Sequence, residues 1–166
     1  MLFANIILGE NVQMDPSASI NNIIVGDHVK IAKQVSAYGS PQHLLEIGEN
    51  TYIGMNSILN GYSAKLTIGK YVSFAQNVNV MVDSGPNASP AMQKVYPLTK
   101  KEIVIGDHSW IGASSIIMPG VQLGKFCVVA ANSFVTNSFP DYSVIGGTPA
   151  KLIKTFSDVE IKQMIL

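Results

Sequence analysis

The sequence predicts an all-β repeat protein whose chain winds into about six three-sided coils of 18 residues. The clearest evidence is residues 105–134, which read as five consecutive six-residue units, IGDHSW-IGASSI-IMPGVQ-LGKFCV-VAANSF. Each unit begins with an aliphatic residue, its fifth residue is small or β-branched, and four of the five units have Gly or Ala in second place. A period of six fits neither an α-helix nor an ordinary half-buried strand, so it indicates stacked repeats.

The spacing of similar units gives the length of one coil. Units that begin alike start at Val25, Ile47, Ile68, Ile105 and Leu123, and the last two lie 18 residues, or three units, apart. The other gaps are 22, 21 and 37 residues, which leaves one excursion in each of these three coils. All three excursions follow the second unit of their coil, so we expect them to leave from the third side or its closing corner. The longest covers about residues 83–102.

Each position of the repeat has an expected physical role. The aliphatic first residue should point inward, and the small fifth residue should fill the narrowing interior. Gly or Ala in second place should let the backbone turn a tight corner. Each side is then a short strand that pairs with the coils above and below at about 4.8 Å.

The repeat fades after Val135, and the final segment SDVEIKQMIL predicts a short helix. Ser157 is the expected N-cap, and Glu160 closes a capping box. We therefore expect a β-helix domain at residues 1–156 and a helical tail at residues 157–166. The tail should cover the open end of the stack, which otherwise presents unpaired strand edges.

The composition suits one domain with a buried core. The chain has 166 residues, of which 47% are apolar and 13% charged, and its formal net charge is zero. The absence of a basic block argues against nucleic acid and against an anionic membrane as partners. The first residues lack a basic segment and a long apolar run, so we expect no signal peptide, no membrane insertion and a cytoplasmic protein. The lone Cys127 falls at an inward fifth position and predicts a buried thiol.

Residues 105–154 carry the most specific signal. They contain WIGA at residues 110–113 and GGTPAK at residues 146–151. With these signatures the repeat resembles the hexapeptide-repeat acyltransferases, in particular the maltose, galactoside and polysaccharide O-acetyltransferases, over nearly the whole chain. The resemblance implies a left-handed parallel β-helix and a homotrimer with its sites at subunit interfaces. It also implies acetyl-CoA as the acyl donor, bound in the groove between neighbours, and a sugar or glycan precursor as the acceptor.

The resemblance assigns the apolar end of the donor site to three residues. Trp110 falls where the family has a Trp that lines the pantetheine channel. Ala113 and Ala131, one coil apart, fall where small residues let the pantetheine approach the backbone. The same two alanines also suit plain packing between coils.

The polar end of the donor site is assigned in the same way. Thr136 matches a family hydroxyl, and Lys154 matches a basic residue near the nucleotide phosphates. Lys151 is a second cation available there. Asn137 stands where many relatives have Lys, which implies a weaker or rearranged phosphate contact.

The family's general base is a histidine in the long excursion, and this chain has none there. Its place falls on Asp83 or Gly85, and four interpretations stay open. Asp83 is the base, although residues 83–86 are equally typical of a turn. Alternatively, His43 supplies an imidazole from the excursion two coils earlier, about 10 Å along the stack. In the third interpretation the acceptor is an amine, which is nucleophilic without prior deprotonation. In the fourth, catalysis has been lost.

The leading hypothesis from the sequence is an acetyl-CoA-dependent transferase that acetylates a hydroxyl of a sugar or surface-glycan precursor. The alternatives are a sugar N-acetyltransferase and a non-catalytic trimeric β-helix protein. No metal is expected, because His28, His43 and His108 are far apart in the sequence and the chain has no closely spaced pair. His28 and His108 both occur as Gly-Asp-His at outward positions, where we expect exposure to solvent.

Overall fold

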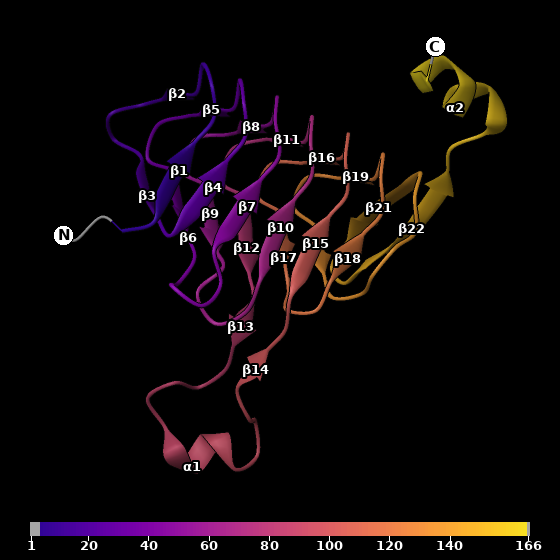
Figure 1. The fold of residues 1–166 in the computed structure, drawn as a ribbon. Helices are drawn as coiled ribbons and strands as arrows, with labels where there is room; N and C mark the ends of the chain where they lie inside the picture. Colours follow the sequence, from indigo (N-terminus) through magenta and orange to yellow (C-terminus); the bar gives the residue numbers. More distant parts are fainter. Residues whose placement is uncertain (1–3, 166) are drawn as a thin grey trace.

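The computed structural model describes residues 4–165 as a three-sided β-solenoid (Figure 1). Three sheets of six, eight and six strands form its sides, and within them all strands are parallel except the last one of the eight-stranded sheet. The chain visits the sheets in a fixed order. The predicted fold class, with short strands and about six coils, is therefore confirmed. Residues 1–3 and 166, which the predicted domain bounds include, lie outside the described residues.

The strands are short, and each side of the solenoid is one sheet. Sheet A contains β1 (Ile6–Leu8), β4 (Ile23–Val25), β7 (Leu45–Ile47), β10 (Leu66–Ile68), β15 (Ile103–Ile105) and β18 (Gln122–Leu123). Sheet B contains β2 (Gln13–Met14), β5 (Lys30–Ile31), β8 (Tyr52–Ile53), β11 (Ser73–Phe74), β16 (Trp110–Ile111), β19 (Val128–Val129), β21 (Ser143–Gly147) and β22 (Ala150–Thr155). Sheet C contains β3 (Ser19–Asn21), β6 (Ser36–Tyr38), β9 (Ile58–Asn60), β12 (Asn79–Met81), β17 (Ile116–Ile117) and β20 (Phe134–Val135).

The interior is filled as the repeat predicts. Ile105 and Ile111, both first residues of their units, are fully buried, and burying such a side chain is worth roughly 1.5–3 kcal/mol. The fifth residues are buried as well, and their polar groups are paired. The Ser109 hydroxyl donates to the carbonyl of Gly124 at 3.2 Å and accepts from the amide of Cys127 at 3.2 Å. Cys127 is buried as expected, and this burial raises the pKa of its thiol.

The corners are built differently from the prediction. Gly106, in second place, is not in the left-handed region, but a Cβ there would lie 2.5 Å from the carbonyl carbon of Gly124 in the next coil. The second residue is therefore small because consecutive coils approach closely. The fourth residue turns the corner instead, with φ of 59° at His108 and 58° at Ser114. Such a conformation is uncommon for residues with a Cβ, and the surrounding strands hold it in place.

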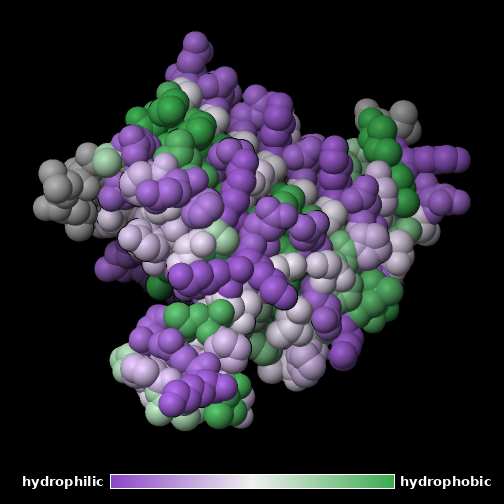
Figure 2. Space-filling view, turned by 60° about the horizontal axis from the view of Figure 1, so that its bottom comes forward, coloured by the Kyte–Doolittle hydropathy of each residue, from purple (hydrophilic) through white to green (hydrophobic). Residues whose placement is uncertain are grey.

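All three excursions leave from one corner, between sheet C and sheet A, as predicted. They follow β6, β9 and β12 and occupy residues 39–44, 61–65 and 82–102. The longest opens with the antiparallel pair β13 (Asp83–Ser84) and β14 (Thr99–Lys100), carries α1 (Pro90–Gln93) at its tip and projects from the stack (Figure 1). Figure 2 brings this excursion forward and shows hydrophilic side chains across the middle of the molecule, with hydrophobic patches toward both ends of the stack.

The C-terminal segment differs in part from the prediction. β22 folds back antiparallel on β21, and α2 (Asp158–Ile165) follows it. The capping box is confirmed: the Ser157 hydroxyl accepts from the Glu160 amide at 3.3 Å, and a Glu160 carboxylate oxygen accepts from the Ser157 amide at 2.7 Å. The prediction that the tail covers the open end of the stack is wrong for a single chain. The β21–β22 hairpin carries the chain outward, so α2 buries none of its described side chains and stands clear of the coils (Figure 1).

Candidate functional site

The predicted site residues form two groups on different parts of the solenoid. One group lies on sheet B or on its corner with sheet C, and it comprises Trp110, Ala113, Ala131, Lys151 and Lys154. The other lies at the corner between sheets C and A, and it comprises His43, Asp83 and Thr136. In a three-sided solenoid this corner is opposite sheet B. The packed interior therefore separates the two groups within one chain.

Trp110 is the first residue of an apolar wall on the outer face of sheet B. Its side chain is 57% exposed because successive residues of a strand point to opposite faces, and Ile111 takes the inward one. Trp110 pairs in register with Val128 of β19, and Val128 pairs with Val144 of β21. Both valines are half-buried. The apolar wall (Trp110, Val128 and Val144) thus offers one ring and two branched side chains to an extended apolar ligand.

Ala113 and Ala131 lie on consecutive coils at the turn from sheet B to sheet C. The amide of Asn132 donates to the carbonyl of Ala113 at 2.8 Å, which joins the two turns. Ala113 is half-buried and Ala131 is exposed, so neither belongs to the interior. Internal packing therefore does not account for their small size. Beside the apolar wall, they leave room for a chain such as pantetheine to approach the backbone.

The two lysines of the C-terminal hairpin have different environments. The Lys154 ammonium lies 2.6 Å from a carboxylate oxygen of Glu160 and 5.1 Å from the centroid of the Phe156 ring. The hydrogen bond from Lys154, with those from Ser157, lowers the pKa of Glu160 to about 2. The Lys151 side chain has no hydrogen bond or ion pair within residues 4–165. Of the two predicted phosphate contacts, Lys151 is therefore the cation that is free to meet a ligand.

Thr136 does not lie beside the apolar wall of its own chain. It follows β20 at the excursion corner, where its exposed side chain lines a hollow of about 500 Å³ together with the long excursion. Ser84, Tyr96 and Thr99 line the same hollow from the excursion side. The predicted role of Thr136 in the donor site therefore requires the excursion corner of one chain to meet sheet B of another.

Asp83 has the partner that a catalytic carboxylate needs. It is half-buried in β13, and the side-chain amide of Asn60 donates to its Oδ1 at 3.3 Å. The Asn60 amide is itself oriented, because its carbonyl oxygen accepts from the amide of Tyr62 at 3.0 Å. Tyr38 pairs with Asn60 in sheet C. The pKa of Tyr38 is raised, first by burial and second by the negative charge of Asp83. Asp83 is thus part of a small polar cluster with Asn60 and Tyr38.

His43 lies at the same corner but outside this cluster. It is half-buried in the first excursion, where its amide donates to the Ser40 carbonyl at 3.1 Å. Among the described residues its imidazole makes no hydrogen bond, ion pair or ring contact. Tyr38, at the end of the preceding strand, is the residue of this coil that interacts with Asp83. The structure therefore brings Asn60 and Tyr38, rather than His43, to the candidate base.

The two Gly-Asp-His histidines are exposed as expected, but their surroundings differ. Both are left-handed corner residues between sheets A and B. His108 is stacked between Tyr71 and Phe126, with ring centroids 4.9 and 4.7 Å apart, and Phe126 in turn stacks on Tyr142 at 5.3 Å. His28 has no ring contact within the described part of the chain and lines a pocket instead.

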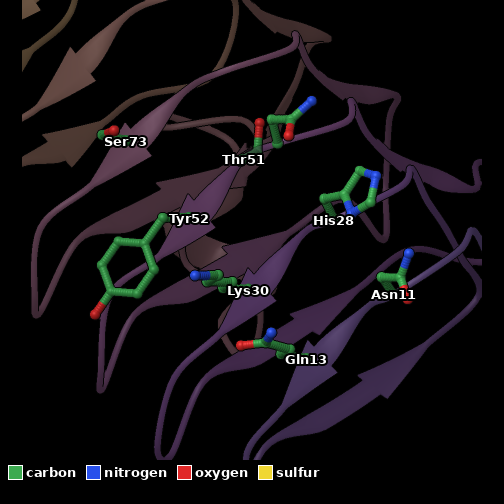
Figure 3. Close-up of a pocket in the computed structure, with 8 residues that line it drawn as sticks. Asn11, Gln13, His28, Lys30, Thr51, Tyr52 and Ser73 are labelled. Atoms are coloured by element: carbon green, nitrogen blue, oxygen red, sulfur yellow. The ribbon is translucent and has the colours of Figure 1, made fainter.

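This pocket is the feature that sequence reasoning missed. It is a hollow of about 930 Å³ on the N-terminal half of sheet B (Figure 3), lined by Asn11, Gln13, His28, Lys30, Asn50, Thr51, Tyr52 and Ser73. Across neighbouring strands of sheet B, Lys30 pairs in register with Tyr52, and Tyr52 pairs with Ser73. Ser73 in turn pairs with Trp110. All four are the sixth residue of their unit, so their shared position was a signal in the sequence. This polar pocket therefore continues the apolar wall along one face.

Two further properties of the described residues bear on function. Between residues 4 and 165, no three His, Cys, Asp or Glu side chains are grouped so as to hold a metal ion. In the same range, no helix is both long and apolar enough to cross a membrane.

The comparisons with known proteins agree with this geometry. Residues 102–137 match the family model described as the hexapeptide repeat of succinyl-transferase. The galactoside O-acetyltransferase of Escherichia coli K12 is 35% identical over 123 residues, which cover 74% of this chain and 58% of that protein. The chain therefore spans less than two thirds of this relative's length.

Two solved structures extend the likeness to most of the chain. A galactoside acetyltransferase in complex with coenzyme A matches with a TM-score of 0.65 and 27% identity, over 93% of this chain and 67% of that one. AntD, an N-acyltransferase from Bacillus cereus, matches with a TM-score of 0.81 and 24% identity, over 97% and 89% of the two chains. Because repeat, coil length and relatives all agree, the chain belongs to the hexapeptide-repeat acetyltransferase family.

Proposed function

We propose that the protein transfers an acyl group, most simply acetyl, from coenzyme A to the amino group of a sugar. The observation that carries the proposal is Asp83, a half-buried carboxylate held by Asn60 at the position where the family resemblance implies an imidazole. The donor side of the proposal is supported by the apolar wall, the surface alanines and the free cation Lys151.

The proposed site needs two copies of the chain. Trp110 faces outward from sheet B, whereas Asp83 and Thr136 stand at the opposite corner of the solenoid. Placing the excursion corner of one chain against sheet B of the next brings both groups to one groove. A closed ring of three such contacts gives the homotrimer that the resemblance implies, with three equivalent sites.

A carboxylate suits an amine acceptor better than a hydroxyl. A neutral amine attacks the thioester carbonyl without losing a proton first, and only the cationic adduct has to release one. In this step the C–N bond forms and the C–S bond breaks. The amine proton passes to Asp83, which hands it on to the departing thiolate, so that free coenzyme A leaves and the carboxylate is restored. A sugar hydroxyl must be deprotonated as it attacks, which asks for a stronger base than a carboxylate.

The relatives contain both chemistries. AntD, the N-acyltransferase, has been crystallised with dTDP-4-amino-4,6-dideoxyglucose and coenzyme A. The crystallised AntD variants include substitutions of a serine and of an aspartate ten residues after it. Asp83 and Ser73 have the same spacing here. The 35% identity to a galactoside O-acetyltransferase favours a sugar hydroxyl as the second candidate acceptor.

A thiol-release assay with acetyl-CoA tests the proposal. The acceptors are matched pairs of amino sugars and the parent sugars with a hydroxyl at the same carbon, both free and nucleotide-linked. We expect turnover with amino sugars and a loss of kcat of about 10²- to 10⁴-fold in Asp83→Asn. Turnover of hydroxyl sugars alone would support the second candidate. No turnover with any acceptor, together with no binding of coenzyme A, would leave only a non-catalytic solenoid.

His43→Ala is the matched control for the base. We expect it to retain wild-type kcat because His43 stands outside the Asp83 cluster. If His43→Ala loses activity and Asp83→Asn does not, the imidazole is the base and our assignment is wrong.

A further inference from the structure

We propose that the polar pocket on sheet B binds the phosphate groups of a glycosyl phosphate or diphosphate, which is the anionic end of the acceptor. The inference rests on the proposed function for the identity of the acceptor's other end. It assigns the N-terminal half of the sheet B face, which the donor does not need, to a ligand of a defined chemical class.

The pocket offers hydrogen-bond donors that the chain itself does not use. Among the described residues, the side chains of Gln13, His28, Lys30 and Tyr52 have no hydrogen bond, ion pair or ring contact. Figure 3 shows these side chains on neighbouring strands and turns of one face. A phosphate group has three acceptor oxygens and up to two charges, so it takes several donors and at least one cation. The pocket supplies both.

Among residues 4–165, no carboxylate lines the pocket. The acidic residues that precede lining residues in the sequence, Glu10, Asp27 and Glu49, are not part of the lining. Asp27 accepts the amide of Glu10 at 2.7 Å, and Glu49 lies 3.0 Å from the ammonium of Lys70. The two ionisable lining residues near the strand ends, His28 and Lys30, are both basic. This lining favours an anionic ligand.

The contrast with the other half of the same face shows that the pocket is not a general property of the repeat. At the corner, Tyr71, His108, Phe126 and Tyr142 stack on each other and fill their column. On the strands of this half, the apolar wall occupies the positions that Lys30 and Tyr52 occupy in the N-terminal half. His28 occupies the corner position of His108, with φ of 58° and 59°, but faces an open hollow instead of two rings.

The length and direction of the pocket fit such a ligand. Ser73, at one end, pairs with Trp110 of the apolar wall, and Gln13 lies three coils away, at about 14 Å by the inter-strand spacing. This length accommodates a sugar ring near Ser73, where the acyl group arrives, followed by two phosphates near Lys30. The exposed Tyr52 ring between them offers a flat face to the sugar or to a base.

The test measures binding of UDP, dTDP and inorganic pyrophosphate to the full chain by isothermal titration calorimetry. We expect Lys30→Gln to weaken the binding of all three about 10- to 100-fold, the range for hydrogen bonds to charged groups. His28→Asn should weaken binding as well. Lys125→Gln is the matched control, because Lys125 lies on a corner of the C-terminal half, 3.2 Å from Asp107, and should change nothing. Thermal unfolding of each variant checks that it is folded.

Two further comparisons identify the carrier of the phosphates. If UDP and dTDP bind about tenfold more tightly than pyrophosphate, and Tyr52→Leu removes that gain, the acceptor is nucleotide-linked. If all three bind alike, the site takes the diphosphate of any carrier, lipid-linked ones included. Both results support the proposal.

Three outcomes would overturn the proposal. The first is no binding of any probe at millimolar concentration. The second is binding that neither Lys30→Gln nor His28→Asn weakens. The third is a Lys30→Gln variant that loses coenzyme A binding instead, which would make the pocket part of the donor site. Lys30-dependent diphosphate binding without any acyl transfer would overturn the proposed function and leave the phosphate site standing.

Discussion

The side-chain amide of Asn60 holds Oδ1 of Asp83 at 3.3 Å and thereby ties the start of the long excursion to the preceding coil. The two residues are 23 positions apart. Asn60 ends β9, whose partner β12 ends at Met81, so the sheet C register places the amide below the start of the excursion. The candidate base is thus positioned by the regular part of the fold and not by the excursion itself.

Replacing Asn60 with Ala should lower kcat more than it changes the KM for acetyl-CoA. A hydrogen bond to a charged group contributes about 1.5 kcal/mol, so we expect a fall in kcat of roughly tenfold as Asp83 loses its orientation. Asn60→Asp should act differently, because a second carboxylate repels the charge on Asp83 and shifts the acid limb of the pH–kcat profile upward.

The control for this pair is Asn87→Ala, an exposed asparagine of the same excursion. It should leave kcat and the pH profile unchanged. A merely structural role for Asn60 would lower the melting temperature of both Asn60 variants without moving the profile of Asn60→Asp.

Replacing Trp110 with Ala should raise the KM for acetyl-CoA about tenfold, which corresponds to about 1.4 kcal/mol of lost donor binding. The side chain is 57% exposed, so the melting temperature should change little. Ile7→Ala, which removes an apolar side chain of sheet A at a residue that is 56% exposed, is the control. An equal change of KM in both variants would show that Trp110 has no special place in the donor site.

The repeat made most of the fold predictable, because a hexad constrains the solenoid at every position. The inward residues Ile105 and Ser109, the coil of 18 residues and the common corner of the excursions all follow from it. The role of Gly106 was misassigned, since the sequence does not reveal how closely two coils approach. The outward course of α2 was also missed, because a capping box predicts a helix but not the surface on which it packs.

The candidate site was less predictable for a related reason. Asn60 and Asp83 meet only because an excursion of variable length separates regular coils, so no fixed spacing relates them in the sequence. The polar pocket combines residues such as Lys30 and Ser73 from several coils, and the excursions between those coils obscure their shared position in the unit. The apolar wall was easier to predict, because Trp110 stands in an uninterrupted run.

The aromatic column should stabilise the C-terminal half of the solenoid through His108. His108→Asn keeps a residue that tolerates a positive φ but removes two ring contacts, at 4.9 and 4.7 Å. Each exposed stack is worth about 0.5 kcal/mol, so we expect a loss of about 1 kcal/mol and a melting temperature lower by about 2–4 °C.

His28→Asn is the matched control for this stacking effect. It makes the same change at the equivalent corner, where φ is 58° and no ring of the described residues is in contact. Its melting temperature should stay near that of the wild type. Equal destabilisation by both variants would assign the effect to the corner backbone instead of the stacked rings.

The C-terminal helix should lose its order as the pH falls, because its cap depends on an ionised Glu160. Hydrogen bonds from Lys154 and Ser157 lower the pKa of Glu160 from 4.5 to about 2 in the folded chain. A lowered folded pKa means that the carboxylate stabilises the folded form fully above the unfolded value of 4.5. This contribution is lost as the pH falls from there toward 2.

Backbone amide shifts of residues 157–165, followed by NMR between pH 7 and pH 2, should therefore move toward coil values in this window. Glu160→Gln should show the weakened cap already at pH 7 and remove most of the pH dependence. Fraying with the same midpoint in Glu160→Gln would show that another group controls the helix.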